Sequence, residues 1–217
     1  MGLISAILDI LFPPRCVFCR SFLKNGEKEI CAECVEHLPY TTGGGEKTGD
    51  FFTVCVAPLY YADKVRESIL RFKFHGATAY SKTYGKLLAD CIRENLSGRY
   101  DLISWVPLSS KRLKERGYDQ SMLLAMAAAL ELGDVAVCTL DKMRDVEKQS
   151  IVGSAEKRRA NISGAYRAAD PELVQGKRIL LIDDIVTTGS TLSECARTLR
   201  EAGADEVLCT AVARTKD

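Results

Sequence analysis

The sequence predicts an α/β protein, a parallel sheet flanked by helices, with a small N-terminal module built around four cysteines. An apolar, branched run begins at Arg178 and ends in Asp183 and Asp184, which is typical of a strand buried on both faces of a parallel sheet. A segment with helical spacing follows at residues 192–202. Two Cys-x-x-Cys pairs lie close to the N-terminus, as in small metal-stabilised modules. With 217 residues, of which 47% are hydrophobic and 27% charged, the chain can bury one sizeable core and still supply such a module.

The overall composition and the first residues argue against several classes of protein. A net charge of +1 shows no global bias toward nucleic acid. Nine cysteines without a signal peptide favour a reducing compartment, so we expect a cytoplasmic location. Residues 3–12 are apolar but include Asp9, and they are shorter than the roughly 20 residues that span a bilayer. We expect them to form a small docking helix that ends at Pro13 and Pro14, with peripheral membrane contact as the alternative.

The N-terminal cysteines have metal-ligand spacing. Cys16 and Cys19 form one pair, Cys31 and Cys34 the other, and eleven residues separate the pairs. Each pair can direct two thiolates at one metal ion, so the two together predict a closed, structural Zn²⁺ site. A redox dithiol or unrelated thiols are the alternatives, but thioredoxin-like pairs occur singly beside a strand and a helix. We expect His37 at the surface and the other cysteines as small core residues: Cys55, Cys91, Cys138, Cys195 and Cys209.

A domain boundary is predicted just after this module. Residues 40–50 are polar and glycine-rich, as linkers are. We therefore expect residues 1–45 to hold the N-terminal helix and the zinc-binding module, and residues 46–217 to form the main domain. The next segment, residues 51–61, is rich in Val, Phe and Tyr and predicts one or two strands, with Pro58 indicating an edge or a bulge.

Two amphipathic helices are expected next, at residues 63–74 and 83–95. Lys73 lies near the end of the first helix, close to Gly76. This lysine could reach an anion or remain solvated, and the sequence favours neither. We expect His75 to be a surface or packing residue and not a catalyst.

A second buried strand, at residues 101–106, leads directly into a basic segment, residues 111–116. A charge run is usually a solvated face. This one follows a predicted strand at the edge where α/β sheets bind ligands, so we expect Arg112, Arg116 or both to contact an anionic ligand. The remaining expected elements are a helix at residues 121–132, a strand at 135–140, a charged stretch at 141–167 and a last strand at 206–213.

The central strand ends in a loop with a specific chemistry. Asp183 and Asp184 close the strand, and small hydroxylated residues follow: Thr187, Thr188, Gly189, Ser190 and Thr191. Loop amides at a helix N-terminus form an anion site, and Gly189 lets the backbone approach a phosphate. The loop has no lysine, which excludes a Walker-type loop. Carboxylates beside a phosphate site can accept hydrogen bonds from a ribose diol or help to place hydrated Mg²⁺, so we expect a ligand with a sugar, a phosphate and Mg²⁺.

Residues 182–191 resemble the phosphoribosyl-pyrophosphate (PRPP) loop of type I phosphoribosyltransferases. The resemblance implies that Asp183 and Asp184 hold the ribose hydroxyls and that residues 187–191 hold the 5′-phosphate. It also implies that the basic segment occupies the place of the pyrophosphate loop. The polar stretch at residues 141–167 fits the hood that closes over a phosphoribosyl donor, with an exposed loop plus a short helix as the alternative.

The whole chain resembles one branch of that fold, the ComF family of competence-associated proteins. The resemblance rests on the four-cysteine module, Lys73 with Gly76, residues 112–120, Gln149, residues 161–166 and the PRPP loop. The chain departs from the family pattern at Ser109, where the family often has His, and at Tyr118-Asp119, where it often has Phe-Asn.

Three functions are compatible with these features. The first is an enzyme that binds PRPP with Mg²⁺, transfers the phosphoribosyl group to an unknown nucleophile and releases pyrophosphate. The second is a DNA-uptake factor that binds single-stranded DNA or partner proteins, which the family association favours and the net charge does not. The third is a PRPP-binding protein without catalysis.

Overall fold

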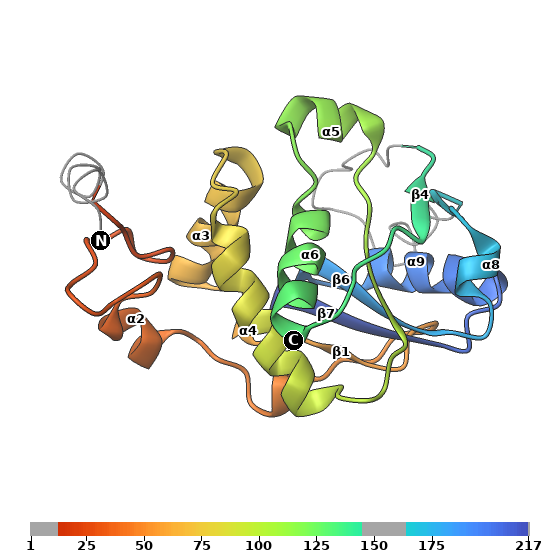
Figure 1. Cartoon of the computed structure of the whole chain (residues 1–217), viewed down its shortest axis with the longest axis horizontal. Coiled ribbons are helices and arrows are strands. Elements are labelled where there is room, and N and C mark those ends of the chain that lie inside the picture. The colour runs from red at the N-terminus through yellow and green to blue at the C-terminus, as the bar shows by residue number, and fades with distance from the viewer. Residues whose placement is uncertain (1–12, 145–163, 217) are drawn as a thin grey trace.

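The computed structural model describes residues 13–144 and 164–216. Its centre is a parallel sheet in which β7 lies between β6 and two short edge strands, and β6 lies between β7 and β3 (Figure 1). All of these pairings are parallel, which confirms the predicted fold class. The strands are β1 (Cys55–Val56), β2 (Leu59–Tyr60), β3 (Leu102–Trp105), β6 (Arg178–Val186) and β7 (Glu206–Arg214).

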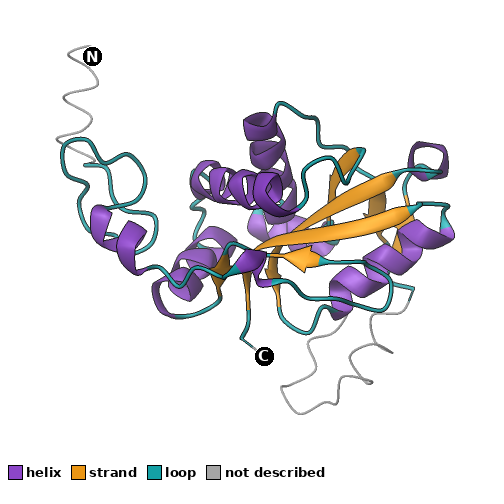
Figure 2. Ribbon diagram, turned by 90° about the horizontal axis from the view of Figure 1, so that it is seen from below, coloured by secondary structure: helices purple, strands orange, loops and turns teal. Residues whose placement is uncertain are grey.

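Helices cover both faces of this sheet (Figure 2). Leu180 and Ile182 of β6 belong to the same apolar core as α3, α4 and α6, whereas Ile179 and Leu181 pack with α9 on the opposite face. This alternation explains why β6 is an unbroken apolar run, since a strand covered on both faces has no solvent side. The helices are α2 (Ala32–His37), α3 (Asp63–Phe74), α4 (Tyr80–Asn95), α5 (Ser110–Arg116), α6 (Gln120–Leu132), α8 (Pro171–Val174) and α9 (Ser190–Glu201).

The contact between α4 and α6 depends on a missing side chain. A Cβ atom added at Gly85 of α4 would lie 2.5 Å from the Ala127 Cβ of α6, so only glycine allows this approach. The contact fixes α6 over β3 and β6, and α6 begins at the edge of the sheet where the acidic pair lies.

The predicted edge strand is broken in two. β1 and β2 both pair with β7, and Ala57 and Pro58 separate them. Proline cannot donate a ladder hydrogen bond, so the interruption falls where the sequence indicates it. The segment that joins the cysteine module to these strands includes a short 3₁₀ turn (Gly43–Gly45), and Lys47 bridges to Cys55 in antiparallel fashion. Residues 40–50 are thus packed along the sheet, and the domain boundary between 45 and 46 stays a prediction.

The strand predicted at residues 135–140 is wrong over most of its length. Ala136 forms only an isolated bridge to Ile103, and the strand that does form, β4 (Leu140–Lys142), pairs antiparallel with β5 (Tyr166–Ala168) outside the main sheet. Because the chain leaves the sheet there, Cys138 is exposed and is not the core residue that we expected. The other four single cysteines are buried, as predicted.

The basic segment 111–116 forms a helix, α5, which the sequence analysis did not predict. Ser109 caps its start by accepting a hydrogen bond from the Arg112 backbone N–H at 3.3 Å, and Gly117 ends it in a left-handed conformation with φ 80°. In Figure 1, α5 projects beyond the body of the sheet.

The cysteine module packs directly on the main domain. Phe18 shares the apolar core of α3 and α4, the Ser68 hydroxyl donates to the Val17 carbonyl at 2.7 Å, and Arg71 donates to the Phe18 carbonyl at 2.6 Å. The N-terminal helix expected at residues 3–12 lies outside the described residues. In the part of the chain that is described, no helix has the length and apolarity needed to cross a bilayer.

Candidate functional site

The four N-terminal cysteines converge as their spacing predicts. Their sulfur atoms all lie within 4.8 Å of one another, and the Cys19 and Cys31 sulfurs are 3.5 Å apart. Sulfurs bound to one tetrahedral Zn²⁺ at about 2.3 Å lie about 3.8 Å from each other, so the cluster fits a zinc ion. The Cys31 amide approaches the Cys16 sulfur at 3.5 Å. Four thiolates leave no open coordination position, which makes the site structural. His37 is exposed and outside the cluster, as expected.

The acidic pair lies near the carboxyl end of β6, at the edge of the sheet where parallel strands present their ligands. Asp183 Oδ1 accepts a hydrogen bond from the Ser121 hydroxyl at 3.0 Å and another from the Asp184 amide at 2.8 Å. Asp184 Oδ2 lies 2.9 Å from the Lys73 ammonium nitrogen. Lys73 therefore does reach an anion, and that anion is the acidic pair.

Burial and charge set the protonation of this group. Burial, reinforced by the neighbouring Asp184 carboxylate, raises the pKa of Asp183, although Lys73 and the two hydrogen bonds oppose the shift. Burial alone would lower the pKa of Lys73, but the Asp184 carboxylate outweighs it and the pKa of Lys73 is raised. Lys73 consequently stays a cation beside the two carboxylates.

The hydroxyl loop turns from β6 into α9. Gly189 occupies the N-cap with φ 77°, a left-handed conformation that favours glycine. The Thr188 and Ser190 hydroxyls are 2.9 Å apart, and the Ser190 amide donates to Thr188 Oγ1 at 3.4 Å. Thr187 and Thr188 are exposed, and they precede the N-terminus of a twelve-residue helix, where the helix dipole favours an anion.

One cavity of about 340 Å³ brings most of the expected site residues together. Both aspartates, Lys73, Arg112 and Arg116 line it, so the acidic pair and the basic segment face the same space. From the loop, Thr187 and Thr191 line this cavity, whereas Thr188, Gly189 and Ser190 do not. A second cavity of about 280 Å³ shares Lys73, Arg112 and Arg116 with the first. The anionic end of a ligand can therefore extend along the basic side chains.

The cavity also contains residues that the sequence analysis did not propose. Gln120 and Ser121 come from the first turn of α6, and Lys142 and Tyr166 come from β4 and β5. The Lys142 ammonium nitrogen lies 5.0 Å from the centre of the Tyr166 ring. Gln120 and Ser121 directly follow Asp119, the N-cap of α6. Asp before a helical pattern is a helix-start signal, and that signal could have placed both residues in the first turn of a helix.

The departures from the family pattern have structural explanations. Ser109 caps α5, and Asp119 caps α6 by accepting from the Met122 amide at 3.1 Å. The other Asp119 oxygen accepts from the Leu108 amide at 2.8 Å, and burial raises the pKa of this carboxyl. Asp119 is 7% exposed, and its oxygens accept hydrogen bonds from backbone amides. Its main effect is therefore to stabilise the loop after β3 and the start of α6, and not to repel a ligand.

The hood expected at residues 141–167 falls mostly outside the described residues, as do Gln149 and residues 161–163. The two described ends of this stretch, residues 141–144 and 164–167, contribute to the two-stranded ribbon of β4 and β5. The Gly164 amide donates to the Glu194 carboxylate of α9 at 2.6 Å, which ties this ribbon to the helix behind the hydroxyl loop.

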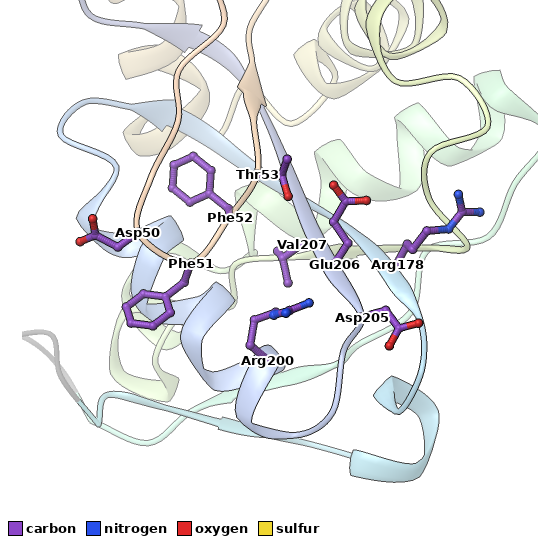
Figure 3. Close-up of a pocket in the computed structure, with 9 residues that line it drawn as sticks. All are labelled: Asp50, Phe51, Phe52, Thr53, Arg178, Arg200, Asp205, Glu206 and Val207. Carbon is purple, nitrogen blue, oxygen red and sulfur yellow. The ribbon is translucent and has the colours of Figure 1, made fainter.

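A larger hollow of about 700 Å³ lies at the opposite end of the strands, where β6 and β7 begin (Figure 3). Arg178, Arg200, Asp205 and Glu206 line it, with the exposed ring of Phe51. Arg178 is held there by the Asp101 carboxylate, with contacts of 2.6 and 3.1 Å. This hollow contains none of the expected site residues.

Comparisons with known proteins agree with this organisation. Residues 119–217 match the phosphoribosyl transferase domain family and residues 7–47 match the double zinc ribbon domain family. Within the described ranges, one group of four cysteines lies close enough to bind an ion, and the zinc ribbon match supports a structural zinc there.

Three curated relatives are similar over most of their length. Competence protein F of Haemophilus influenzae is 27% identical over 221 residues, covering 92% of this chain and 96% of that protein. DNA utilization protein YhgH of Escherichia coli (strain K12) is 36% identical over 206 residues, covering 87% and 86%. Competence protein ComFC of Streptococcus pneumoniae is 29% identical over 194 residues, covering 87% and 77%. The chain therefore belongs to the ComF family and joins a type I phosphoribosyltransferase-like fold to an N-terminal zinc ribbon.

Proposed function

We propose that this protein binds PRPP with Mg²⁺ and transfers its phosphoribosyl group to a nucleophile, with release of pyrophosphate. The observation that carries the proposal is one cavity in which the acidic pair, two loop threonines and four cationic side chains meet. Each group matches one part of the donor: carboxylates for the ribose diol, loop hydroxyls and helix amides for the 5′-phosphate, and cations for the pyrophosphate.

Asp183 is proposed to accept hydrogen bonds from the ribose hydroxyls through a carboxylate that Ser121 already orients. Asp184 would share this task and help to place hydrated Mg²⁺, which would neutralise pyrophosphate charge as the leaving group departs. Lys73, held 2.9 Å from Asp184, keeps the two carboxylates compatible with an anionic ligand. Thr187 and Thr191, with the amides at the start of α9, would bind the 5′-phosphate.

The chemistry proposed for the chain is positioning and charge stabilisation. Breaking the bond between the ribose C1 and the pyrophosphate oxygen leaves an oxocarbenium-like centre and a highly charged leaving group. Arg112 and Arg116 would stabilise the leaving group in a pocket partly shielded from water, where fixed cations act more strongly than in solution. The nucleophile then forms the new bond to C1 and loses a proton. This proposal covers the donor half of the reaction and leaves the identity of the nucleophile open.

The test is calorimetric titration of the zinc-loaded protein with PRPP and Mg²⁺. We expect micromolar binding, and at least about a hundredfold weakening in Asp183→Asn/Asp184→Asn, because two charge-assisted hydrogen-bonding groups are lost. Asp205→Asn, an acidic residue at the opposite end of the sheet, is the matched control and should bind as the unmodified chain does. No binding by the folded, zinc-loaded protein would refute the proposal. Binding would justify screening acceptors by pyrophosphate release.

A second candidate function is binding of single-stranded DNA, with the cavity as a non-catalytic PRPP-type site. Two observations favour it: α5 exposes Lys111 and Lys114 in addition to the arginines that face the cavity, and relatives carry the names DNA utilization protein and competence protein. Fluorescence anisotropy with an oligonucleotide at several salt concentrations tests it. Lys111→Ala/Lys114→Ala should weaken binding across sequences and reduce the salt slope by about one unit per lost phosphate contact. Unchanged affinity and slope would remove α5 as the DNA surface.

A further inference from the structure

Three consecutive residues at the start of α6 are buried side by side, and each holds a different wall of the proposed donor cavity. Asp119, Gln120 and Ser121 are 7%, 1% and 4% exposed. Polar side chains buried this deeply need hydrogen-bond partners, and the partners identify what each residue does. Asp119 bonds to the amide of Leu108, in the loop after β3, and Ser121 bonds to Asp183.

Gln120 bonds to the basic segment. Its Oε1 accepts a hydrogen bond from Arg116 Nη1 at 2.7 Å, and its Nε2 lies 3.5 Å from the Tyr118 carbonyl oxygen. On its other side, the Arg116 guanidinium carbon lies 4.8 Å from the centre of the Phe74 ring. An arginine side chain loses considerable rotamer entropy when it is fixed, so holding it in advance lowers the cost of ligand binding.

The chemical type of the partner is informative. A glutamine oxygen holds the guanidinium without cancelling its charge, whereas a carboxylate would neutralise it. The phenylalanine ring likewise attracts the cation without supplying a counter-charge. Arg116 is therefore fixed by neutral groups and keeps its full positive charge toward the cavity that it lines. That is the arrangement expected for a side chain that meets an anion.

We propose that Gln120 is a positioning residue that directs Arg116 at the pyrophosphate end of the donor, while its neighbour Ser121 holds Asp183 for the ribose end. This inference rests on the proposed function and assigns two neighbouring residues to two separate parts of the ligand. The first turn of α6 then sets the spacing between the leaving-group cation and the ribose carboxylate.

The experiment compares two probes, PRPP with Mg²⁺ and ribose 5-phosphate, which lacks the pyrophosphate. Gln120→Met removes the acceptor at similar volume. It should weaken PRPP binding about tenfold, as expected for a lost hydrogen bond to a charged group, and leave ribose 5-phosphate binding unchanged. Ser121→Ala should weaken both probes by the same factor. Gln175→Met, an exposed glutamine outside the cavity, is the control and should change neither.

A double-mutant comparison isolates the pair. In an Arg116→Ala background, Gln120→Met should cause no further loss of PRPP affinity, because the group that it positions is gone. Equal weakening of both probes by Gln120→Met, or an undiminished effect in the Arg116→Ala background, would show a general structural role and overturn the inference.

Two further outcomes are separable. If Gln120→Met fails to fold by circular dichroism, Gln120→Glu replaces it: the acceptor stays but the Arg116 charge is cancelled, so PRPP binding should fall and ribose 5-phosphate binding should not. PRPP binding that survives unchanged in Gln120→Glu would overturn the inference alone. Absence of PRPP binding in the unmodified protein would overturn the proposed function with it.

Discussion

The cysteine cluster and the proposed donor cavity are assembled in opposite ways. All four thiols come from residues 16–34, and two local turns are enough to bring them together. The cavity takes its charged residues from α3, α5, β4 and β6, which lie far apart in the chain. A local site can be recognised from spacing alone, whereas the second site exists only when the sheet and its helices have packed.

The two sites nevertheless share one helix. The N-terminal part of α3 meets the cysteine module, where Lys64 lies 2.9 Å from Glu33 and Ser68 bonds to Val17. The C-terminal part of α3 carries Lys73 to Asp184. The zinc module therefore supports the helix that delivers one of the cavity's cations, and the comparison can be tested by breaking each region in turn.

The largest effect is expected from loss of the zinc ligands. Cys31→Ser, or removal of the metal by a chelator, should lower the free energy of unfolding of the whole chain by at least about 3 kcal/mol, because metal binding contributes directly to folding and the cysteines share a core with α3 and α4. Thermal unfolding followed by circular dichroism, with metal content measured in parallel, checks this. Cys138→Ser is the matched control, since Cys138 is exposed and outside the cluster. A metal-free chain with an unchanged melting temperature would show that the module is energetically independent.

A smaller effect is expected at the cavity end of α3. Lys73→Met leaves the Asp184 carboxylate, whose side chain is 10% exposed, without its cation and should cost about 2 kcal/mol at neutral pH. Lys64→Met on the same helix breaks a solvent-exposed pair and should cost less than about 0.5 kcal/mol. Urea unfolding of both variants measures the difference. Equal losses of unfolding free energy in the two variants would mean that the deeper burial of the Lys73–Asp184 pair has no effect on stability.

Asp183 should make stability depend on pH. The pKa of Asp183 is raised in the folded state, so the folded protein binds this proton more tightly than the unfolded chain does. The stability that comes from this proton is present at acidic pH and is lost as the pH rises through the folded-state pKa. Asp183→Asn, which removes the ionisation, should therefore be the more stable chain by at least about 1 kcal/mol at neutral pH.

The advantage of Asp183→Asn should vanish below the usual aspartate range, near pH 3.9. Unfolding free energies measured from about pH 3 to about pH 8, a range that extends below the usual aspartate pKa, check the sign. An advantage that is constant with pH would mean that packing, and not ionisation, separates the two chains.

The smallest effects compare one glycine in each region. Gly189 has φ 77° and Gly26 has φ 93°, so replacing either by alanine should cost about 1 kcal/mol of strain. Neither added methyl group would meet a neighbour closer than 3.5 Å. Only Gly189→Ala should also weaken PRPP binding, because only that loop is proposed to hold the 5′-phosphate. Equal loss of binding in Gly26→Ala would contradict the separation of the two sites.

Much of the fold could be predicted because the signals are local. The apolar run that begins at Arg178 identified the central strand, although β6 continues past the predicted end at Asp184 to Val186. Helical spacing located α3 at its observed bounds. The strand predicted at residues 135–140 failed because a short apolar run does not reveal whether a neighbouring strand is available. Ala136 forms only an isolated bridge to Ile103, and Leu140 pairs with Ala168 outside the main sheet. The family resemblance placed a pyrophosphate loop where α5 forms, although Ser109 and Gly117 contained the capping signals of a helix.

The sequence by itself determined the chemical groups: four thiols at metal-ligand spacing, two adjacent carboxylates, a hydroxyl loop and a basic segment. Only the tertiary structure decided how they combine. It placed Lys73 against Asp184, Ser121 against Asp183 and Gln120 against Arg116. The physical reason is that spacing along one turn is fixed by backbone geometry, whereas contacts between distant segments depend on how the sheet, α3 and α6 pack against each other.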